Sequence, residues 1–122
     1  MVRRMPKQSA ARSPAELNRI FQALADPTRR AVLERLGKGP ASMGDLAQPF
    51  DMALPSFAQH LDVLENCGLV RSTKTGRVRT YELQAQTLGE AEHWLARQRI
   101  FWGRRLDQLD NYLETMKKEQ KT

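Results

Sequence analysis

The 122-residue chain has a single cysteine, two histidines and no long apolar segment. Because one cysteine cannot form an internal disulfide, the lone Cys67 excludes a disulfide-stabilised extracellular domain. No segment approaches the ~20 apolar residues that a membrane-spanning helix needs. The first residues are basic but lack the apolar core of a secretory signal. These absences predict a cytoplasmic protein that does not engage a membrane.

Groups that could carry catalysis or bind a metal are also sparse. The histidines, the cysteine and the scattered carboxylates form no spaced acid–base or nucleophile set, and residues 37–40 are a helix stop rather than a phosphate loop. We therefore expect neither an enzyme nor a cofactor site. Glu90, Glu92 and His93 are neighbours, but one histidine without a second does not make a zinc site, so we expect no bound metal. We expect Cys67 to pack as a small apolar residue.

The net charge of +6 at pH 7 is concentrated in two segments. Residues 1–12 and 69–81 contain basic side chains and no acid: Arg3, Arg4, Lys7 and Arg12 in the first, and Arg71, Lys74, Arg77 and Arg79 in the second. Clustered positive charge attracts a polyanion such as DNA. The alternative is that these charges only keep the protein in solution. We expect residues 1–12 to form a flexible arm.

Cap signals and apolar spacing predict three helices before residue 50. Residues 13–16 read as a capping box with proline at the first helical position, and Asp26-Pro27 opens a second helix. Residues 38–41 are expected to form a loop. A third helix begins after Ser42, and Pro49 limits it to about two turns because proline cannot continue the backbone hydrogen-bond ladder.

Residues 55–66 have the apolar spacing of a fourth helix, and two short strand patterns follow it around a turn at Thr75-Gly76. The strands form a hairpin over residues 69–83, and the side chains expected to pack on the helices are Val70, Val78 and Tyr81. Short helix, turn, second helix and basic hairpin are the layout of a winged helix-turn-helix. The sequence therefore predicts a mainly α fold with a small β-hairpin.

In this layout the second helix enters the DNA major groove and the hairpin, or wing, contacts the backbone. The polar face near the start of helix 55–66 consists of Ser56, Gln59 and His60. Because glutamine can pair with adenine and serine can bond several bases, we expect this face to read base edges. His60 has an alternative role in packing where the helix meets the hairpin. The wing residues expected to contact phosphates or the minor groove are Arg71, Lys74, Thr75, Arg77 and Arg79.

A single helical pattern runs from Thr87 to about Lys118, and its apolar positions recur at steps of three or four. A helix of ~30 residues is about 45 Å long, which exceeds what a domain this small can cover. We expect two copies to pack across this helix as a symmetric dimer, through Leu88, Leu95, Trp102, Leu106, Leu109, Leu113 and Met116. The alternative, folding back onto the chain's own core, accounts only for the first half of the helix.

Several motifs at fixed spacing resemble the ArsR-type winged-helix transcription regulators. They are ALADPTRRAVLERL at residues 23–36, FDM at 50–52, HLxVLE at 60–65, GLV at 68–70 and GRxRxYxL at 76–83. The resemblance covers residues 14–116, nearly the whole chain. It implies a cytoplasmic prokaryotic homodimer that binds operator DNA, usually represses transcription, and often releases the DNA when an effector binds.

The chain departs from the family pattern in the recognition helix. Ala53 stands where members commonly have a capping serine or threonine, which forfeits about 1 kcal/mol unless Asp51 caps the helix instead. Ala58 stands where members commonly have serine. Members that sense metals carry a Cys-x-Cys motif in the third helix, whereas residues 43–48 contain no cysteine. The resemblance therefore implies a member of the non-metal-sensing type.

The sequence thus predicts a basic arm at 1–12, a winged helix-turn-helix DNA-binding domain at 13–84, and a C-terminal dimerisation helix with its tail at 85–122. The predicted function is sequence-specific regulation of transcription, as a homodimeric repressor that binds double-stranded DNA at a palindromic operator. Two alternatives stay open. One is a nucleoid-type DNA binder without sequence preference, and the other is an adaptor that binds another protein through the C-terminal helix. No effector is indicated.

Overall fold

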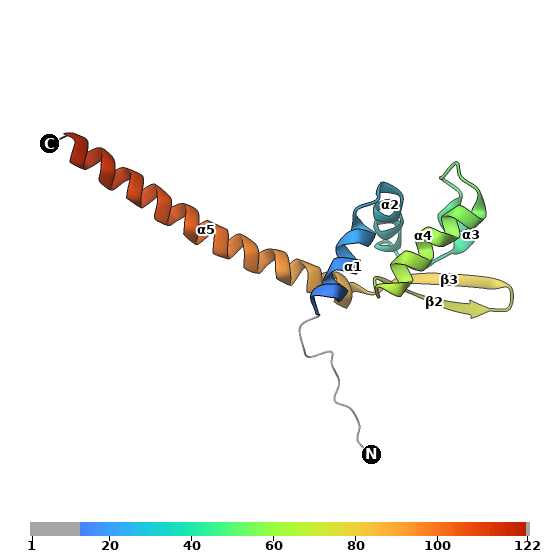
Figure 1. Cartoon of the computed structure of the whole chain (residues 1–122). Helices are drawn as coiled ribbons and strands as arrows, with labels where there is room; N and C mark the ends of the chain where they lie inside the picture. Colours follow the sequence, from blue (N-terminus) through green and yellow to red (C-terminus); the bar gives the residue numbers. More distant parts are fainter. Residues whose placement is uncertain (1–12, 122) are drawn as a thin grey trace, which may run out of the picture. The chain divides into compact units, whose positions relative to one another are not determined.

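The computed structural model describes residues 13–121 (Figure 1), so the predicted arm at residues 1–12 lies outside the described residues. In chain order the elements are α1 (Pro14–Leu24), α2 (Pro27–Leu36), β1 (Ala41–Ser42), α3 (Met43–Ala47), α4 (Leu54–Asn66), β2 (Val70–Thr75), β3 (Val78–Leu83) and α5 (Ala85–Lys121). They fall into two units, one that ends at Ala91 and one that begins at Glu92. The predicted class, mainly helical with a small antiparallel sheet, is confirmed.

Local caps set the start of the first two helices. Before α1, the Ser13 hydroxyl accepts a bond from the Glu16 N–H at 3.2 Å, and the Glu16 carboxylate accepts one from the Ser13 N–H at 2.9 Å. This reciprocal pair is the predicted capping box. Before α2, the Asp26 carboxylate accepts a bond from the Arg29 N–H at 3.1 Å. Each bond satisfies a donor that the first helical turn would otherwise leave without a partner.

The helix-turn-helix is formed by α3 and α4. The Ser42 hydroxyl caps α3 by accepting a bond from the Asp45 N–H at 3.1 Å. No side chain caps α4, so Asp51 does not replace the hydroxyl that Ala53 lacks. Pro55 lies in the first turn of α4 and has no N–H, so one donor that a cap would satisfy is absent. This proline reduces the need for a capping side chain.

The chain leaves α4 through a tight turn at Gly68, whose φ of +85° would strain a residue with a side chain. The Leu69 N–H donates to the Leu64 carbonyl at 3.0 Å, and the Gly68 N–H donates to the Glu65 carbonyl at 3.0 Å. These two bonds satisfy carbonyls at the end of α4 and direct the chain into β2. The wing therefore follows α4 directly, without an intervening loop.

The wing consists of β2 and β3, and its turn lies one residue later than predicted. Thr75 and Val78 pair across the end of the hairpin. The two residues between them, Gly76 and Arg77, form the turn, and the φ of +63° at Gly76 suits a tight hairpin with glycine first. The expectation that Val78 packs on the helices is wrong, because its place beside the turn leaves it 52% exposed.

The segment predicted as a loop before α3 ends in a short strand, β1. The strand order of the sheet is β1-β3-β2, and Ala41 pairs with Tyr81 while Ser42 pairs with Thr80. A strand of two residues is too short to show the alternation by which strands are recognised in a sequence. Its pairing makes β3 the central strand.

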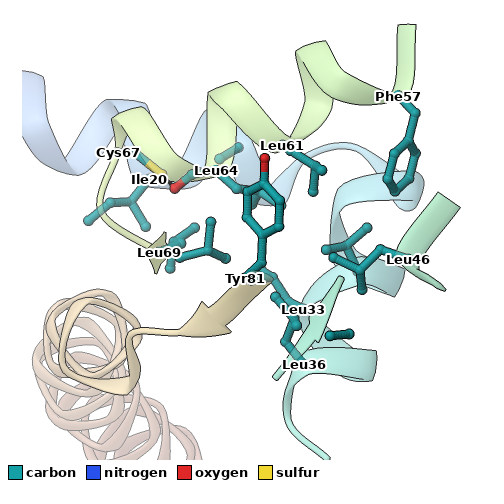
Figure 2. Packing of buried hydrophobic residues seen from close by; sticks show 14 of the residues in the cluster. Ile20, Leu33, Leu36, Leu46, Phe57, Leu61, Leu64, Cys67, Leu69 and Tyr81 are labelled. Atoms are coloured by element: carbon teal, nitrogen blue, oxygen red, sulfur yellow. Dashed lines mark hydrogen bonds between the residues drawn. The ribbon is translucent and has the colours of Figure 1, made fainter. Parts of the chain in front are cut away.

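Tyr81 on the central strand lies in the middle of the hydrophobic core (Figure 2). Its ring projects from β3 toward α4, where the hydroxyl lies near Leu61 and Leu64. α4 buries Phe57 together with these two leucines, and burial of each such side chain is worth about 1.5–3 kcal/mol. Cys67 is also buried, with its Sγ 3.4 Å from the Leu64 carbonyl, so it packs as predicted. One face of α4 is thus held firmly.

α5 is a single uninterrupted helix that extends beyond the predicted Thr87–Lys118 at both ends (Figure 1). Thr87 and Ala91, within the first unit, are buried, so the start of the helix packs on the chain's own core. In the second unit most of the large apolar side chains are exposed, whereas Trp94 is partly buried. The exposed ones are Leu95, Ile100, Phe101, Trp102, Leu106, Leu109, Tyr112, Leu113 and Met116. Among the helices of residues 13–121, none has the length and apolar character needed to cross a membrane.

Candidate nucleic-acid interface

The face of α4 that points away from the core carries the predicted reading residues. Phe57 and Leu61 are fully buried on one side, which fixes the rotation of the helix. Ser56 and Gln59 therefore lie exposed on the other side. Because residues three and four apart share a helical face, the exposed Val63 continues the same row. Two of the three predicted base-reading side chains thus face outward together.

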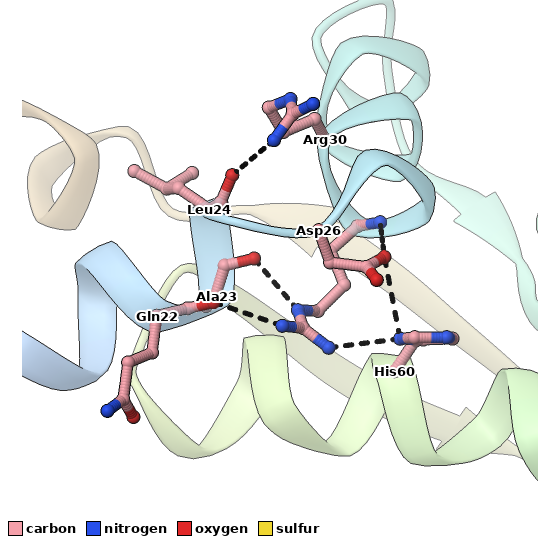
Figure 3. Close-up of polar contacts among 7 residues, drawn as sticks. Gln22, Ala23, Leu24, Asp26, Arg30 and His60 are labelled. Carbon is pink, nitrogen blue, oxygen red and sulfur yellow. Dashed lines mark hydrogen bonds and ion pairs between the residues drawn. The ribbon is translucent and has the colours of Figure 1, made fainter.

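His60 is less accessible, with 23% of its side chain exposed, and its Nδ1 lies 3.1 Å from Nη1 of Arg29 (Figure 3). A guanidinium can only donate, so Nδ1 accepts this bond in the neutral ring and the proton resides on Nε2. The ring therefore keeps an N–H donor on the edge that points away from Arg29. The bonding partner of His60 comes from α2 and not from the hairpin, and the packing role expected where α4 meets the hairpin stays a prediction.

Arg29 ties α4 to the helices behind it. Its Nε donates to the Ala23 carbonyl at 2.8 Å and its Nη2 donates to the Gln22 carbonyl at 3.0 Å. Both carbonyls lie in the last turn of α1, and the Gln22 carbonyl also accepts a bond from the Ala25 N–H at 3.2 Å. No local spacing in the sequence could reveal that this arginine also reaches His60, because the bond joins residues far apart in the chain. The network was therefore missed at the level of sequence.

Asp26 lies beside the same group, with its Oδ2 3.8 Å from Nδ1 of His60. Burial alone would raise the pKa of Asp26, but the bond from the Arg29 N–H and the charges of His60 and Arg29 hold that pKa below its usual value of 3.8. The ion pair with Asp26 needs a protonated ring, whereas the bond from Arg29 needs a neutral one. The contact from Arg29 is the shorter of the two at Nδ1, so the geometry fits the hydrogen bond better than the ion pair.

The tip of the wing presents the exposed side chains of Lys74, Thr75 and Arg77. Within the part of the chain that the structure describes, these three side chains form no hydrogen bond or ion pair. Arg71 differs, because it pairs with Glu82 on the neighbouring strand. Both partners are well exposed, and an exposed pair is worth only about 0–1 kcal/mol, so Arg71 can exchange this partner for a phosphate.

Arg79 is held in a chain of bonds that joins the wing to α4. Its Nη1 donates to the Ser72 hydroxyl at 2.8 Å, and that hydroxyl donates to the Glu65 carboxylate at 2.8 Å. Burial, followed by the negative charge of Glu65, raises the pKa of Tyr81, so the phenol stays neutral beneath this chain. Arg79 therefore positions the wing in the free protein, whereas the tip residues have no such task.

The described residues contain no group of three or more histidine, cysteine, aspartate or glutamate side chains that could hold a metal ion. Glu90, Glu92 and His93 accordingly form no such group within residues 13–121. Absence of a metal site stays a prediction, as does the absence of a cofactor.

A helix-turn-helix with an outward polar face on its second helix, followed by a basic wing, defines a winged helix-turn-helix DNA-binding unit. Residues 24–73 match the model of a family described as a helix-turn-helix domain. This match runs from the end of α1 into β2 and so includes both helices of the motif.

The chain is also similar to proteins of known class. The HTH-type transcriptional regulator Rv2034 of Mycobacterium tuberculosis is 42% identical over 98 residues, which cover 80% of this chain and 86% of that protein. The transcriptional repressor SdpR of Bacillus subtilis is 32% identical over 79 residues, 65% of this chain and 88% of that protein. The crystal structure of an ArsR family transcriptional regulator shares 55% identity and a TM-score of 0.73, covering 76% of this chain and 96% of that one. The chain belongs to the ArsR family of transcriptional regulators.

Proposed function

We propose that the protein is a homodimeric repressor that recognises a palindromic operator through α4 and the wing. The observation that supports this proposal is that α4 has one buried face and one exposed polar face. Its buried face is fixed by Phe57 and Leu61, while Ser56 and Gln59 stand exposed on the opposite face. A helix held in this way can enter the major groove without rearranging the core.

Each residue has a distinct task at the DNA. The Gln59 amide pairs with an adenine, and the Ser56 hydroxyl bonds a neighbouring base edge or phosphate. His60 donates from Nε2 to a phosphate or a base acceptor, because Arg29 occupies its Nδ1. Lys74 and Arg77 bind backbone phosphates through the wing, which sets the register of the protein on the duplex rather than its sequence preference.

Dimerisation is supported by the exposed apolar side chains of α5, which need a partner to leave water. A symmetric pair presents two copies of α4, and such dimers bind half-sites about 34 Å apart, one turn of DNA. Repression is supported by the relative that is itself a transcriptional repressor. In this role the protein works in the cytoplasm, holds no metal and performs no catalytic step.

The direct test is binding to the DNA upstream of the protein's own gene, measured against a shuffled sequence of the same composition at two salt concentrations. We expect a preference of about 10³-fold or more that survives the higher salt, because specific complexes retain base contacts when phosphate contacts weaken. Equal binding that collapses with salt at this site and at genome-selected fragments would indicate the nucleoid-type alternative.

The wing assignment has its own test. Arg77→Ala should weaken binding to the preferred and the shuffled DNA alike and lower the salt slope by about 2, because each of the two subunits loses one phosphate contact. The matched control is Arg97→Ala, which removes another exposed arginine, one that lies on α5. If both variants change DNA binding to the same degree, the wing has no special role.

A further inference from the structure

The side chain of Arg29 is oriented by α1 as well as by α4. Its Nε donates to the Ala23 carbonyl at 2.8 Å, and its Nη2 donates to the Gln22 carbonyl at 3.0 Å. The backbone N–H of the same residue donates to the Asp26 carboxylate at 3.1 Å. A guanidinium is a planar fork whose donors keep fixed directions. Because two of its nitrogens are held by carbonyls of α1, the direction of the third, Nη1, is set as well.

The third nitrogen determines which tautomer the His60 ring can adopt. Nη1 of Arg29 lies 3.1 Å from Nδ1 of His60 (Figure 3). Since a guanidinium nitrogen always carries hydrogens, a proton on Nδ1 would face another donor. The acceptor left to such a proton would be the Asp26 carboxylate, whose Oδ2 at 3.8 Å lies beyond hydrogen-bond distance. The distances therefore favour the tautomer in which Nδ1 accepts and Nε2 carries the proton.

Nε2 is the ring nitrogen that remains for a bound partner. Among residues 13–121 it has no hydrogen bond or ion pair, and the side chain of His60 is 23% exposed. His60 follows Ser56 by one helical turn, so the ring lies beside the outward face of α4. A protonated Nε2 in a neutral ring donates and cannot accept. Its partner on DNA is therefore a hydrogen-bond acceptor.

We propose that Arg29 is a positioning residue for DNA recognition. It holds the His60 ring in one orientation and one tautomer, so that Nε2 donates to an acceptor on the operator. The inference rests on the proposed function and adds to it a residue of α2, outside the helix-turn-helix. The acceptor is a phosphate oxygen or an acceptor atom of a base edge. A ring that is oriented before binding loses less conformational freedom on the DNA, which favours affinity.

Arg30 provides a matched control on the same helix. Its Nη1 donates to the Leu24 carbonyl at 2.9 Å, so it also joins α2 to the end of α1 (Figure 3). Among the described residues it forms no hydrogen bond or ion pair with α4. Arg30→Ala therefore removes the same charge and a bond of the same kind without removing the donor to His60.

The first measurement is the tautomer of His60, read by NMR in protein with isotope-labelled histidine at about pH 8, where imidazole rings are ordinarily neutral. Wild type and Arg30→Ala should show Nδ1 without a proton and Nε2 with one. Arg29→Ala should show both tautomers in exchange, while the exposed His93 should not change. A proton on Nδ1 in the wild type would overturn the proposal, even if no variant of Arg29 folded.

The second measurement is a double-mutant cycle for operator binding. Arg29→Ala should weaken binding about tenfold, because each of two subunits loses one modest hydrogen bond and the losses multiply. In a His60→Ala background the same change should weaken binding less than about twofold further, since the ring that Arg29 orients is already absent. Arg30→Ala should stay within about twofold of its parent in both backgrounds. Equal losses from Arg29→Ala in the two backgrounds would overturn the proposal.

Salt dependence and a lysine variant separate positioning from charge. Arg29→Ala should leave the salt slope of binding unchanged, because the proposal gives Arg29 no phosphate contact. A slope lowered by about 2 in the dimer would indicate a direct phosphate contact and contradict the proposal. Arg29→Lys keeps the charge, but one ammonium cannot replace the fork that spans two carbonyls and the ring. This variant should therefore bind as weakly as Arg29→Ala, and binding restored by lysine would also contradict the proposal.

Modified operators identify the acceptor. Single phosphates are replaced by methylphosphonates, or single bases by analogues that lack one acceptor, in both half-sites. One replacement should weaken wild-type binding about tenfold and leave His60→Ala unaffected; a methylphosphonate would identify a phosphate, and a base analogue would identify a base edge. Failure of every replacement to do so would overturn the proposal.

These outcomes distinguish the role of Arg29 from the proposed function. A wild type that prefers its operator, combined with equal losses in the two backgrounds of the cycle, overturns the role of Arg29 alone. A wild type without any preference for operator over shuffled DNA overturns the proposed function and this inference together.

Discussion

The unit that ends at Ala91 and the helical segment from Glu92 onward place their apolar residues in opposite environments. In the first unit, side chains such as Leu61 and Tyr81 are buried within the chain. In the second, side chains of equal size such as Trp102 and Leu109 are exposed. Long helices in water derive most of their stability from packing of an apolar face. The comparison shows that one region buries its apolar side chains within a single chain, whereas the other leaves them exposed, as the proposed dimer requires.

The largest difference is expected when the same substitution is made in both regions. Leu61→Ala opens a cavity in the core and should cost about 3 kcal/mol of unfolding free energy, within the 2–5 kcal/mol typical of buried leucines. Leu109→Ala should cost the dilute monomer under about 0.5 kcal/mol, because the leucine is half exposed there. Urea unfolding at low protein concentration measures both, and equal losses would contradict the comparison.

The next effect falls on assembly. Leu109→Asp combined with Leu113→Asp should weaken dimerisation at least about a hundredfold, because burying unpaired carboxylates is strongly unfavourable. Sedimentation should then show monomers, while the thermal transition of the first unit persists. Ile100→Asp is the matched control, since Ile100 is equally exposed on the opposite face of α5. A dimer that survives the double change would mean that other residues form the interface.

A smaller effect is expected from two glycine-to-alanine substitutions, one in each unit, which should change the stability in opposite directions. Gly76→Ala should destabilise the protein by about 1 kcal/mol, because its φ of +63° disfavours a residue with a Cβ. Gly103→Ala should stabilise α5 by about 1 kcal/mol, because the helix has open space there and alanine is the better helix former. Thermal denaturation measures the stability of both variants. If both substitutions raised the stability, or both lowered it, the expected difference between the two glycines would be refuted.

The smallest effect concerns pH and involves only the first unit. The pKa of Asp26 is depressed in the folded state, so its stabilising contribution is present above the unfolded pKa and is lost as the pH falls through the folded pKa. Asp26→Asn keeps an oxygen that can cap α2 but removes this titration. Between pH 6 and 3 the wild type should therefore lose more unfolding free energy than the variant. Parallel curves would show that Asp26 does not contribute.

How much the sequence predicted depends on whether a feature is local. The capping box at Ser13, the cap at Asp26 and the buried face of α4 follow from spacings of three or four residues, and the structure contains all of them. The two-residue strand β1 is too short for such a pattern, and the turn at Gly76 lies one residue from its predicted place. Turn registers depend on which residues pair across strands, which a single sequence does not state.

The same distinction between local and non-local features applies to the candidate site. Exposure of Ser56 and Gln59 followed from helical periodicity, because the positions facing the core were easy to identify. The bonds of Arg29 to His60, and of Arg79 through Ser72 to Glu65, join elements that only the fold brings together. These bonds alter what is expected of two predicted residues. His60 has one ring nitrogen occupied by Arg29, and Arg79 is bonded to Ser72, whereas Arg77 forms no such bond among the described residues.

The central claim is that the outward face of α4 reads the operator. The measurement that tests it most directly is the ratio of affinities for operator and shuffled DNA in wild type, in Gln59→Ala and in the exposed control Gln86→Ala. We predict that Gln59→Ala lowers this ratio by about 10- to 100-fold, the value of one base contact, while Gln86→Ala leaves it unchanged and both variants remain dimers. A Gln59→Ala protein that keeps the full preference would contradict the account.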